Sequence, residues 1–264
     1  MPFTADQCAR LAEAARDFCI LAGREIMRIY ATDFAVHEKS NQSPVTEADE
    51  AAERLILERL RALNPALPIV AEESVARGDI PAVDGKPFWL VDPLDGTREF
   101  ISRNGEFTVN IALIDRGAPI LGAVHLPVQE RTYFASGPGQ AFRLDQGGVT
   151  QPIQARLASP AGLVAVASRS HLDPSTKQHI AGLKVASFTE AGSSLKFCLL
   201  AEGLADHYPR FGRTMEWDTA AGQAVLLASG GSVRNRDGSD LQYGKPDFEH
   251  PPFERGLLIG LTDG

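Results

Sequence analysis

Two carboxylates, Asp92 and Asp95, stand three residues apart at the end of an apolar run. The run, Phe88 to Val91, predicts a buried strand. We expect that strand to end before Pro93, because proline has no backbone N–H to donate and its φ is fixed. The spacing therefore predicts two acidic side chains at a strand end, and carboxylate oxygens are the ligands that a hard cation such as Mg²⁺ prefers.

The next residues predict a helix N-terminus beside the two acids. Gly96 allows the backbone to approach a bulky group closely, and Thr97 is a typical helix N-cap, with the helix expected from Arg98 onward. Free N–H groups and the helix dipole favour an anion. A ligand that brings phosphate and metal together satisfies both kinds of group. The alternative is a purely structural Asx-turn with a cap, which Asp and Thr often form.

Three further acids stand at predicted element ends. Glu72 comes directly after the short predicted strand Pro68 to Ala71, where it can reach a site at that sheet edge. Asp49 lies in the first turn of a helix that opens at Thr46, in the pattern of a capping box, and Asp218 sits where a later helix begins. Each also has a structural alternative, as a surface acid, a complement to the helix dipole or an N-cap.

The elements that position these residues fall into two patterns. Apolar residues at helical spacing predict amphipathic helices from Thr4 to Tyr30 and from Thr46 to Asn64. Short strands joined by tight turns predict an antiparallel meander over residues 107–144. After it, strands (163–167, 185–188) alternate with helices (174–181, 194–202, 218–229), which predicts an α/β half. We expect an N-terminal α+β domain, residues 1–148, and a C-terminal α/β domain, residues 149–264, with the specificity residues and the last metal ligand.

The composition is ordinary for a globular protein, with 44% hydrophobic and 23% charged residues among 264. A formal net charge of −8 argues against a nucleic-acid-binding surface, although bound metal ions can reverse the local field for an anionic substrate. The cysteines Cys8, Cys19 and Cys198 lack C-x-x-C spacing and predict reduced, buried thiols. No signal peptide or membrane-length apolar run is visible. We expect a cytoplasmic protein, and peripheral association with the inner membrane is left open.

Together the motifs resemble the lithium-sensitive phosphatase superfamily that includes the inositol monophosphatases. The family's order and spacing are matched by Glu72-Glu73-Ser74, Asp92 to Thr97, and Trp217-Asp218. Within it, the chain is most similar to the bacterial 3′(2′),5′-bisphosphate nucleotidases, through residues 43–49, 92–100, 103–110 and 192–197. That group usually has Lys in place of Arg98, which keeps the charge. The resemblance implies the layered αβαβα sandwich of the inositol monophosphatase and fructose-1,6-bisphosphatase type.

The resemblance also implies a role for each matched residue. Asp49 and Thr97 would orient the attacking water, beside Glu72, and the backbone N–H groups of Gly96 and Thr97 would hold the phosphate. The implied Mg²⁺ ligands are four carboxylates and one backbone carbonyl: Glu72, Asp92, Asp95, Asp218 and, through its carbonyl, Leu94.

The chemistry of such a site follows from its charge. Five carboxylates in one pocket would raise one another's pKa values unless cations neutralise them. Two or three Mg²⁺ ions remove that problem, and paired metals roughly 3.5–4 Å apart can hold both oxygens of an in-line displacement. Asp49 with Thr97 can complete proton transfer from water. Because no Cys or Ser nucleophile with an adjacent base is evident, we expect direct hydrolysis without a covalent phosphoenzyme.

Cations in the second half are expected to select the substrate. Lys196 lies in the Gly-Ser-Ser-Leu-Lys stretch of the nucleotidase group, and Arg210 stands where inositol monophosphatases place an acid for the inositol hydroxyls. A positive charge at this position, in place of the negative one, favours a second phosphate, which Arg can bind bidentately. We therefore expect cleavage of adenosine 3′,5′-bisphosphate to AMP and phosphate, with Lys196 and Arg210 near the 5′-phosphate. Ser194 is a further substrate contact, and His171 either touches the base or ribose or is simply a packed or exposed histidine.

Two other functions stay open. One is an inositol-1-monophosphatase or related sugar phosphatase with the same metal chemistry. The other is a non-catalytic nucleotide- or metal-binding regulator. The presence of all the matched acids argues against this second alternative. The expected partner is a small phosphorylated nucleotide and not a nucleic acid, and a homodimer is left open. The resemblance also implies lithium sensitivity and a place in sulfur metabolism.

Overall fold

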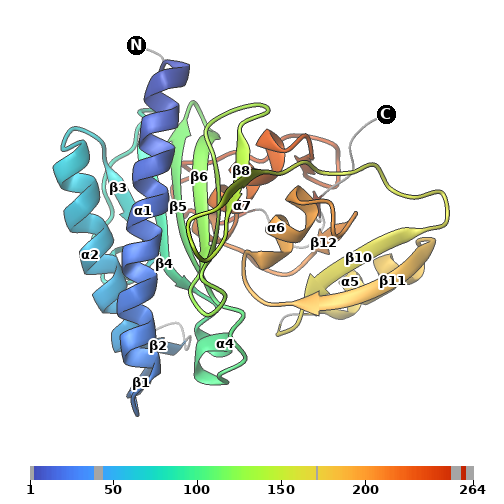
Figure 1. Ribbon diagram of the computed structural model, residues 1–264, viewed down its shortest axis with the longest axis horizontal. Helices are drawn as coiled ribbons and strands as arrows, with labels where there is room; N and C mark the ends of the chain where they lie inside the picture. The colour runs from blue at the N-terminus through green and yellow to red at the C-terminus, as the bar shows by residue number, and fades with distance from the viewer. Residues whose placement is uncertain (1–2, 39–43, 171, 251–256, 260–264) are drawn as a thin grey trace.

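A seven-stranded sheet in the order β3-β4-β5-β6-β7-β8-β9 forms the centre of the molecule (Figure 1). The computed structural model describes residues 3–38, 44–170, 172–250 and, as backbone, 257–259. Strands β3 and β4 pair in parallel and every other neighbouring pair is antiparallel, which confirms the predicted meander. The strands are β3 (Ile69–Ala71), β4 (Phe88–Asp95), β5 (Thr108–Asp115), β6 (Ala118–Leu126), β7 (Arg131–Ala135), β8 (Ala141–Leu144) and β9 (Thr150–Pro152).

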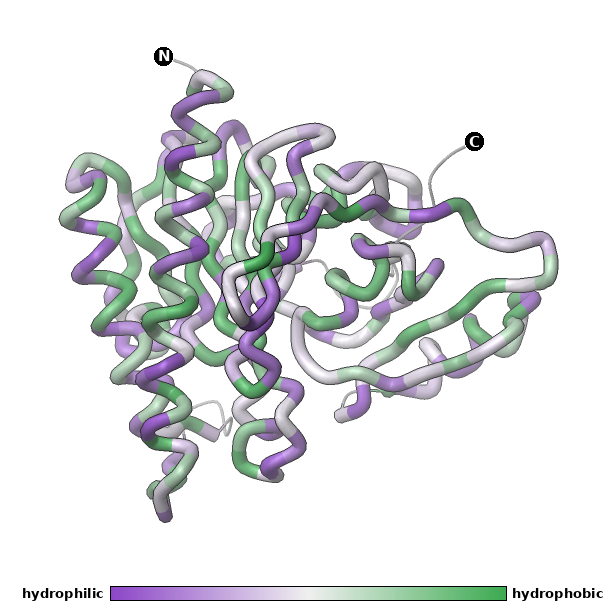
Figure 2. Tube along the Cα trace, in the orientation of Figure 1, coloured by the Kyte–Doolittle hydropathy of each residue, from purple (hydrophilic) through white to green (hydrophobic). Residues whose placement is uncertain are grey.

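Two amphipathic helices, α1 (Ala5–Tyr30) and α2 (Glu47–Leu63), cover one face of this sheet (Figure 1). Hydrophilic and hydrophobic residues alternate along both helices in Figure 2, and their apolar stripes pack on β4 to β7. Thr4 and Thr46 cap the two helices in capping boxes; the sequence predicts the box at Thr46 and a helix start at Thr4. Because these signals are local, both helices begin within one residue of their expected start.

The other face carries α7 (Glu216–Ala228), which packs across β4 to β7 and against α6 (Leu195–Ala201). The approach of α7 to β6 requires Gly122, because a Cβ there would lie 2.8 Å from the carbonyl oxygen of Ala221. A second β layer and α5 lie beyond it (Figure 1), so the expected αβαβα sandwich is confirmed. These outer elements are β10 (Leu163–Ser168), β11 (Val185–Ala191), β12 (Tyr208–Arg210), β13 (Val233–Arg234), β14 (Leu257–Ile259) and α5 (Pro174–Ala181).

Short elements border the ends of β3 and β4. They are β1 (Val36–Glu38), β2 (Pro44–Thr46), α3 (Glu72–Ala76) and α4 (Thr97–Ile101). The expected boundary between residues 148 and 149 stays a prediction; β9, just after it, pairs with β8 in the large sheet. None of the helices in the described ranges is long and apolar enough to cross a bilayer.

The expectation that the strand ends before Pro93 is wrong, because β4 continues to Asp95. Asp92 lies opposite Asn110 of β5, whereas Asp95 lies opposite Thr108, so β4 has one extra residue between these pairs. That extra residue forms a bulge. Pro93 lies inside the bulge, where the ladder is interrupted and its missing N–H breaks no regular pairing.

Two helix starts also differ from the sequence prediction. Gly96, at φ +94°, is the N-cap of α4, so Thr97 is the first helical residue and not the cap. Glycine adopts this left-handed conformation without strain. Met215 is the N-cap of α7, which places Asp218 in the first turn.

The buried thiols and histidines of the core are uncharged. Cys8, Cys19 and Cys198 are free and buried, as predicted. His125, His207 and His250 are 5%, 1% and 2% exposed. Burial lowers the pKa of His125 and of His207 to about 4 and that of His250 to about 3. The folded protein therefore holds all three imidazoles neutral at pH values where an exposed histidine binds a proton.

Acid is expected to destabilise the fold between about pH 6.5 and pH 4. In this range the three histidines bind protons in the unfolded chain but stay neutral in the folded protein. The free energy of unfolding therefore falls by up to about 1.4 kcal/mol per pH unit for each histidine. Above about pH 6.5 both states are neutral and these groups add no slope. Urea unfolding at about pH 7, 6 and 5 measures the effect. His125→Asn should flatten the slope, whereas His37→Asn, at an exposed site, should leave it unchanged; equal slopes in all three proteins would contradict this account.

Candidate active site

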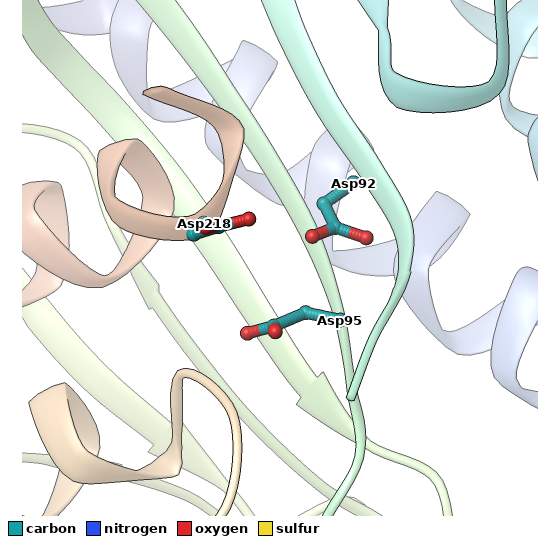
Figure 3. A group of neighbouring side chains, drawn as sticks. All are labelled: Asp92, Asp95 and Asp218. Atoms are coloured by element: carbon teal, nitrogen blue, oxygen red, sulfur yellow. The ribbon is translucent and has the colours of Figure 1, made fainter. Parts of the chain in front are cut away.

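Asp92, Asp95 and Asp218 each place one carboxylate oxygen within 4.8 Å of the others. Figure 3 shows Asp92 and Asp95 extending from β4 and Asp218 from the first turn of α7 toward one point. Residues three apart in a regular strand point to opposite faces. The extra residue of the β4 bulge therefore brings Asp92 and Asp95 to the same side. The structure thus brings these three predicted ligands together. Their role as metal ligands stays a prediction.

This cluster has unfavourable electrostatics without a cation. The pKa of Asp218 is raised, first by removal from water and second by the charge of Asp95, while Arg210 and hydrogen bonds oppose the rise. Those bonds come from Met215 N at 2.9 Å and Thr214 Oγ1 at 3.0 Å. A divalent cation relieves such crowding. Three carboxylate oxygens form the hard, all-oxygen donor set that suits Mg²⁺, so these residues fit the expected metal.

Three donors hold one oxygen of Asp95. Ser193 Oγ, Ser194 Oγ and Asn110 Nδ2 lie 2.7, 3.0 and 3.3 Å from Asp95 Oδ2. Ser194 Oγ also lies 3.0 Å from the carbonyl oxygen of Asp218, so one hydroxyl joins two members of the cluster. These bonds fix the rotation of the Asp95 carboxylate. The role of Ser194 as a substrate contact stays a prediction.

Sequence reasoning did not name Asn110 or Ser193 as site residues. Both lie within the segments 103–110 and 192–197 that carry the family resemblance, and this was the only signal for them. Asn110 is 1% exposed on β5 and resembles any other polar residue in a buried strand. Its contact with Asp95 depends on the register of β4 and β5.

Asp49 connects the cap of α2 to Thr97. Asp49 Oδ2 accepts hydrogen bonds from Thr46 N at 2.8 Å and Thr46 Oγ1 at 2.7 Å. Thr97 Oγ1 donates to Asp49 Oδ1 at 3.1 Å. The structural and functional alternatives for Asp49 are therefore compatible, since one carboxylate oxygen completes the capping box and the other contacts Thr97.

The cluster lies in an open pocket of about 500 Å³. Glu72 lines this pocket. Among the described residues, the acids whose carboxylate oxygens lie within 4.8 Å of one another are the three aspartates, and Glu72 is not one of them. His171, the predicted base or ribose contact, lies outside the described residues. Of the predicted site residues, the pocket lining includes Glu72, Asp92, Leu94, Asp95, Gly96, Thr97, Lys196, Arg210 and Asp218.

Two cations of the pocket wall differ in their bonding. Lys196 is 2% exposed, and its Nζ donates to the carbonyl oxygens of Ala191, at 3.2 Å, and of Ser193. Arg210 Nη2 donates to the carbonyl oxygen of Arg213 at 2.8 Å. The Nε of Arg210 is buried and has no hydrogen-bond partner within the described residues. A buried donor without a partner is unfavourable. Because Arg210 lines the pocket, its guanidinium makes this wall suited to an anion.

Burial alone would lower the pKa of Arg210, but the nearby Tyr208, Asp218 and Asp95 raise it, and the net shift is upward. The guanidinium is therefore always charged and lies close enough to the carboxylate cluster to interact with it. One pocket thus combines an acidic group that suits cations with a basic group that suits an anion.

Comparison with known proteins gives a consistent result. The model of the inositol monophosphatase family matches residues 8–260. A relative from Escherichia coli O157:H7, named 3′(2′),5′-bisphosphate nucleotidase CysQ, is 48% identical over 235 residues, covering 88% of this chain and 94% of its own. The crystal structure of CysQ from Bacteroides thetaiotaomicron superposes with a TM-score of 0.78 at 38% identity, covering 97% of this chain and 98% of its own. An inositol monophosphatase from Anabaena shares the fold, with a TM-score of 0.72 at 24% identity over 96% of this chain and 92% of its own.

Proposed function

The chain belongs to the inositol monophosphatase family, and from this premise we propose that it is a 3′(2′),5′-bisphosphate nucleotidase. Its reaction is hydrolysis of the 3′-phosphate of adenosine 3′,5′-bisphosphate to AMP and phosphate. The observation that supports it most directly is the pairing, in one pocket, of the aspartate cluster with the guanidinium of Arg210. A substrate with two phosphates has one for each group.

The proposed cofactor is Mg²⁺, as two or three ions held by the three clustered aspartates together with Glu72 and the carbonyl of Leu94. Bound there, the ions supply the positive charge that activates water and stabilises the phosphoryl group being transferred. Asn110, Ser193 and Ser194 keep Asp95 in one orientation for this role.

Asp49 and Thr97 orient the attacking water. Because Thr97 Oγ1 donates its hydrogen bond to Asp49 Oδ1, its lone pairs can accept a hydrogen bond from water. As the water loses a proton to Thr97 Oγ1, the hydroxyl proton can pass to Asp49, so the transfer balances. Thr46 holds the second oxygen of Asp49, so the carboxylate cannot rotate away. The first N–H groups of a helix have no intrahelical partner, and Gly96 and Thr97 line the pocket. Their backbone N–H groups are the proposed donors to the phosphate that is cleaved.

The second phosphate lies against Arg210, whose guanidinium offers charge-assisted hydrogen bonds. Lys196 adds positive charge behind the same wall, with its ammonium group 5.3 Å from the centre of the Tyr208 ring. Ser194 and His171 remain proposed substrate contacts, His171 for the base or ribose.

A substrate panel tests the proposal. Phosphate release with Mg²⁺ is expected to be at least about tenfold faster, as kcat/KM, from adenosine 3′,5′-bisphosphate than from inositol 1-phosphate, since one charge-assisted hydrogen bond contributes about 1.5–3 kcal/mol. Adenosine 3′-monophosphate, which lacks the second phosphate, should be cleaved at an intermediate efficiency. Preference for inositol 1-phosphate would instead assign a sugar phosphatase.

We also propose a lithium-sensitive enzyme of sulfur metabolism in the cytoplasm, with no nucleic-acid partner; a homodimer and peripheral membrane contact stay open. Titration with LiCl at constant ionic strength, with KCl as the control salt, tests the lithium sensitivity. Inhibition by LiCl alone is expected, and equal effects of both salts would contradict it.

A further inference from the structure

The helix α3, which begins with Glu72, lacks a cap of its own. Its N-cap residue Ala71 has no side chain that can accept a hydrogen bond. Glu53 of α2 supplies the acceptor instead, since its Oε2 lies 2.8 Å from Glu73 N and 3.3 Å from Ser74 N. These are first-turn N–H groups, which otherwise have no helical partner. The carboxylate of Glu53, from α2, therefore caps the N-terminus of α3.

The second oxygen of Glu53 is also bonded. Glu53 Oε1 accepts from Ser74 Oγ at 2.8 Å and from Arg77 Nη2 at 2.9 Å. Glu53 is only 1% exposed. A buried carboxylate is stable only when its charge is paired and hydrogen-bonded. All four of these hydrogen bonds to Glu53 come from the Glu73 to Arg77 segment. The segment and Glu53 thus hold each other in one arrangement.

The position of Glu53 links two sides of the pocket. Asp49 and Glu53 are one turn apart on α2 and therefore lie on the same face. Asp49 contacts Thr97 at the start of α4, whereas Glu53 contacts the start of α3. One face of a single helix fixes both short helices whose first residues, Thr97 and Glu72, line the pocket.

We propose that Glu53 is a positioning residue that sets the cation affinity of the site by fixing α3, and with it the carboxylate of Glu72. Glu53 itself contacts neither substrate nor cation. This inference rests on the proposed function, in which Glu72 is a cation ligand. A purely structural Glu53 would alter the stability of the fold and the fraction of active protein but not the affinity of that fraction for a cation.

The test measures Mn²⁺ binding directly, by electron paramagnetic resonance of the free ion, because carboxylate sites accept Mn²⁺ as they do Mg²⁺. Glu53→Ala removes all four bonds and is expected to raise the Mn²⁺ dissociation constant, and the Mg²⁺ half-saturation of activity, about tenfold or more. Glu53→Gln can keep its oxygen on the two backbone N–H groups and turn its amide toward Ser74 Oγ, so a smaller shift is expected. KM for adenosine 3′,5′-bisphosphate at saturating Mg²⁺ should change less than twofold.

Two further variants complete the design. Glu50→Ala, at an exposed site of the same helix, is the matched control and should bind Mn²⁺ like the wild type. Ser74→Ala removes one of the four bonds and should give a small rise, which keeps the test valid if Glu53→Ala fails to fold. Wild-type Mn²⁺ affinity in both Glu53→Gln and Ser74→Ala would overturn the inference. Failure of the wild type itself to bind Mn²⁺ or to release phosphate would instead overturn the proposed function.

Discussion

Asp95→Asn is expected to lower kcat about a thousandfold, or about 4 kcal/mol of transition-state stabilisation, while the metal-free protein stays at least as stable as the wild type. The hydrogen bonds around Asp95 give the reason. Ser193, Ser194 and Asn110 all direct donors at Oδ2. An asparagine must place its carbonyl oxygen there, which leaves an NH₂ group in place of the other carboxylate oxygen. A donor then occupies the position of a cation ligand.

The same substitution removes a like charge from the cluster. Since the charge of Asp95 is one of the causes that raise the pKa of Asp218, the pKa of Asp218 should fall in Asp95→Asn. The metal-free variant should therefore melt at the same temperature as the wild type or higher. Added Mg²⁺, which should stabilise the wild type by mass action, should have little effect on it.

The measurements are kcat with adenosine 3′,5′-bisphosphate and melting curves in EDTA and in excess Mg²⁺. Asp33→Asn, at an exposed site, controls for loss of a negative charge and should behave as the wild type. Near-normal activity, or an unchanged Mg²⁺ shift in Asp95→Asn, would remove Asp95 from the set of cation ligands.

Arg210→Ala is expected to lower kcat/KM for adenosine 3′,5′-bisphosphate about 10- to 100-fold and that for adenosine 3′-monophosphate less than about threefold. The range corresponds to one or two charge-assisted hydrogen bonds to a phosphate. The guanidinium of Arg210 is the group concerned, because Arg210 lines the pocket that holds the aspartate cluster. The loss should therefore follow the presence of the second phosphate.

Comparison of the two substrates separates recognition from a general loss of activity. Arg210→Lys should recover part of the efficiency with the bisphosphate, because it restores charge but not the planar guanidinium. Arg116→Ala, whose side chain is 74% exposed, is the control for removal of an arginine. An equal loss with both substrates would show that Arg210 acts through the neighbouring Asp218 and not through the second phosphate.

Short-range patterns in the sequence determined much of the fold. The cap at Thr4 and the capping box at Thr46 located the first turns of α1 and α2, and helical periodicity gave their buried faces. The spaced acidic motifs, read together with a family resemblance, identified the three aspartates that converge. These features can be predicted from the sequence because caps, periodicity and motif spacing depend on residues only a few positions apart.

Tertiary structure alone decided how these residues act. The bulge that turns Asp92 and Asp95 to one side is a shift in the pairing of β4 with β5. Residue types near Pro93 predict a strand end there instead, because the pairing partner is distant in the sequence. The bonds from Ser193, Ser194 and Asn110 to Asp95, and those from Glu53 to α3, join segments about 15 to 99 residues apart. Such contacts form only when distant elements pack together, so no local pattern of residue types specifies them.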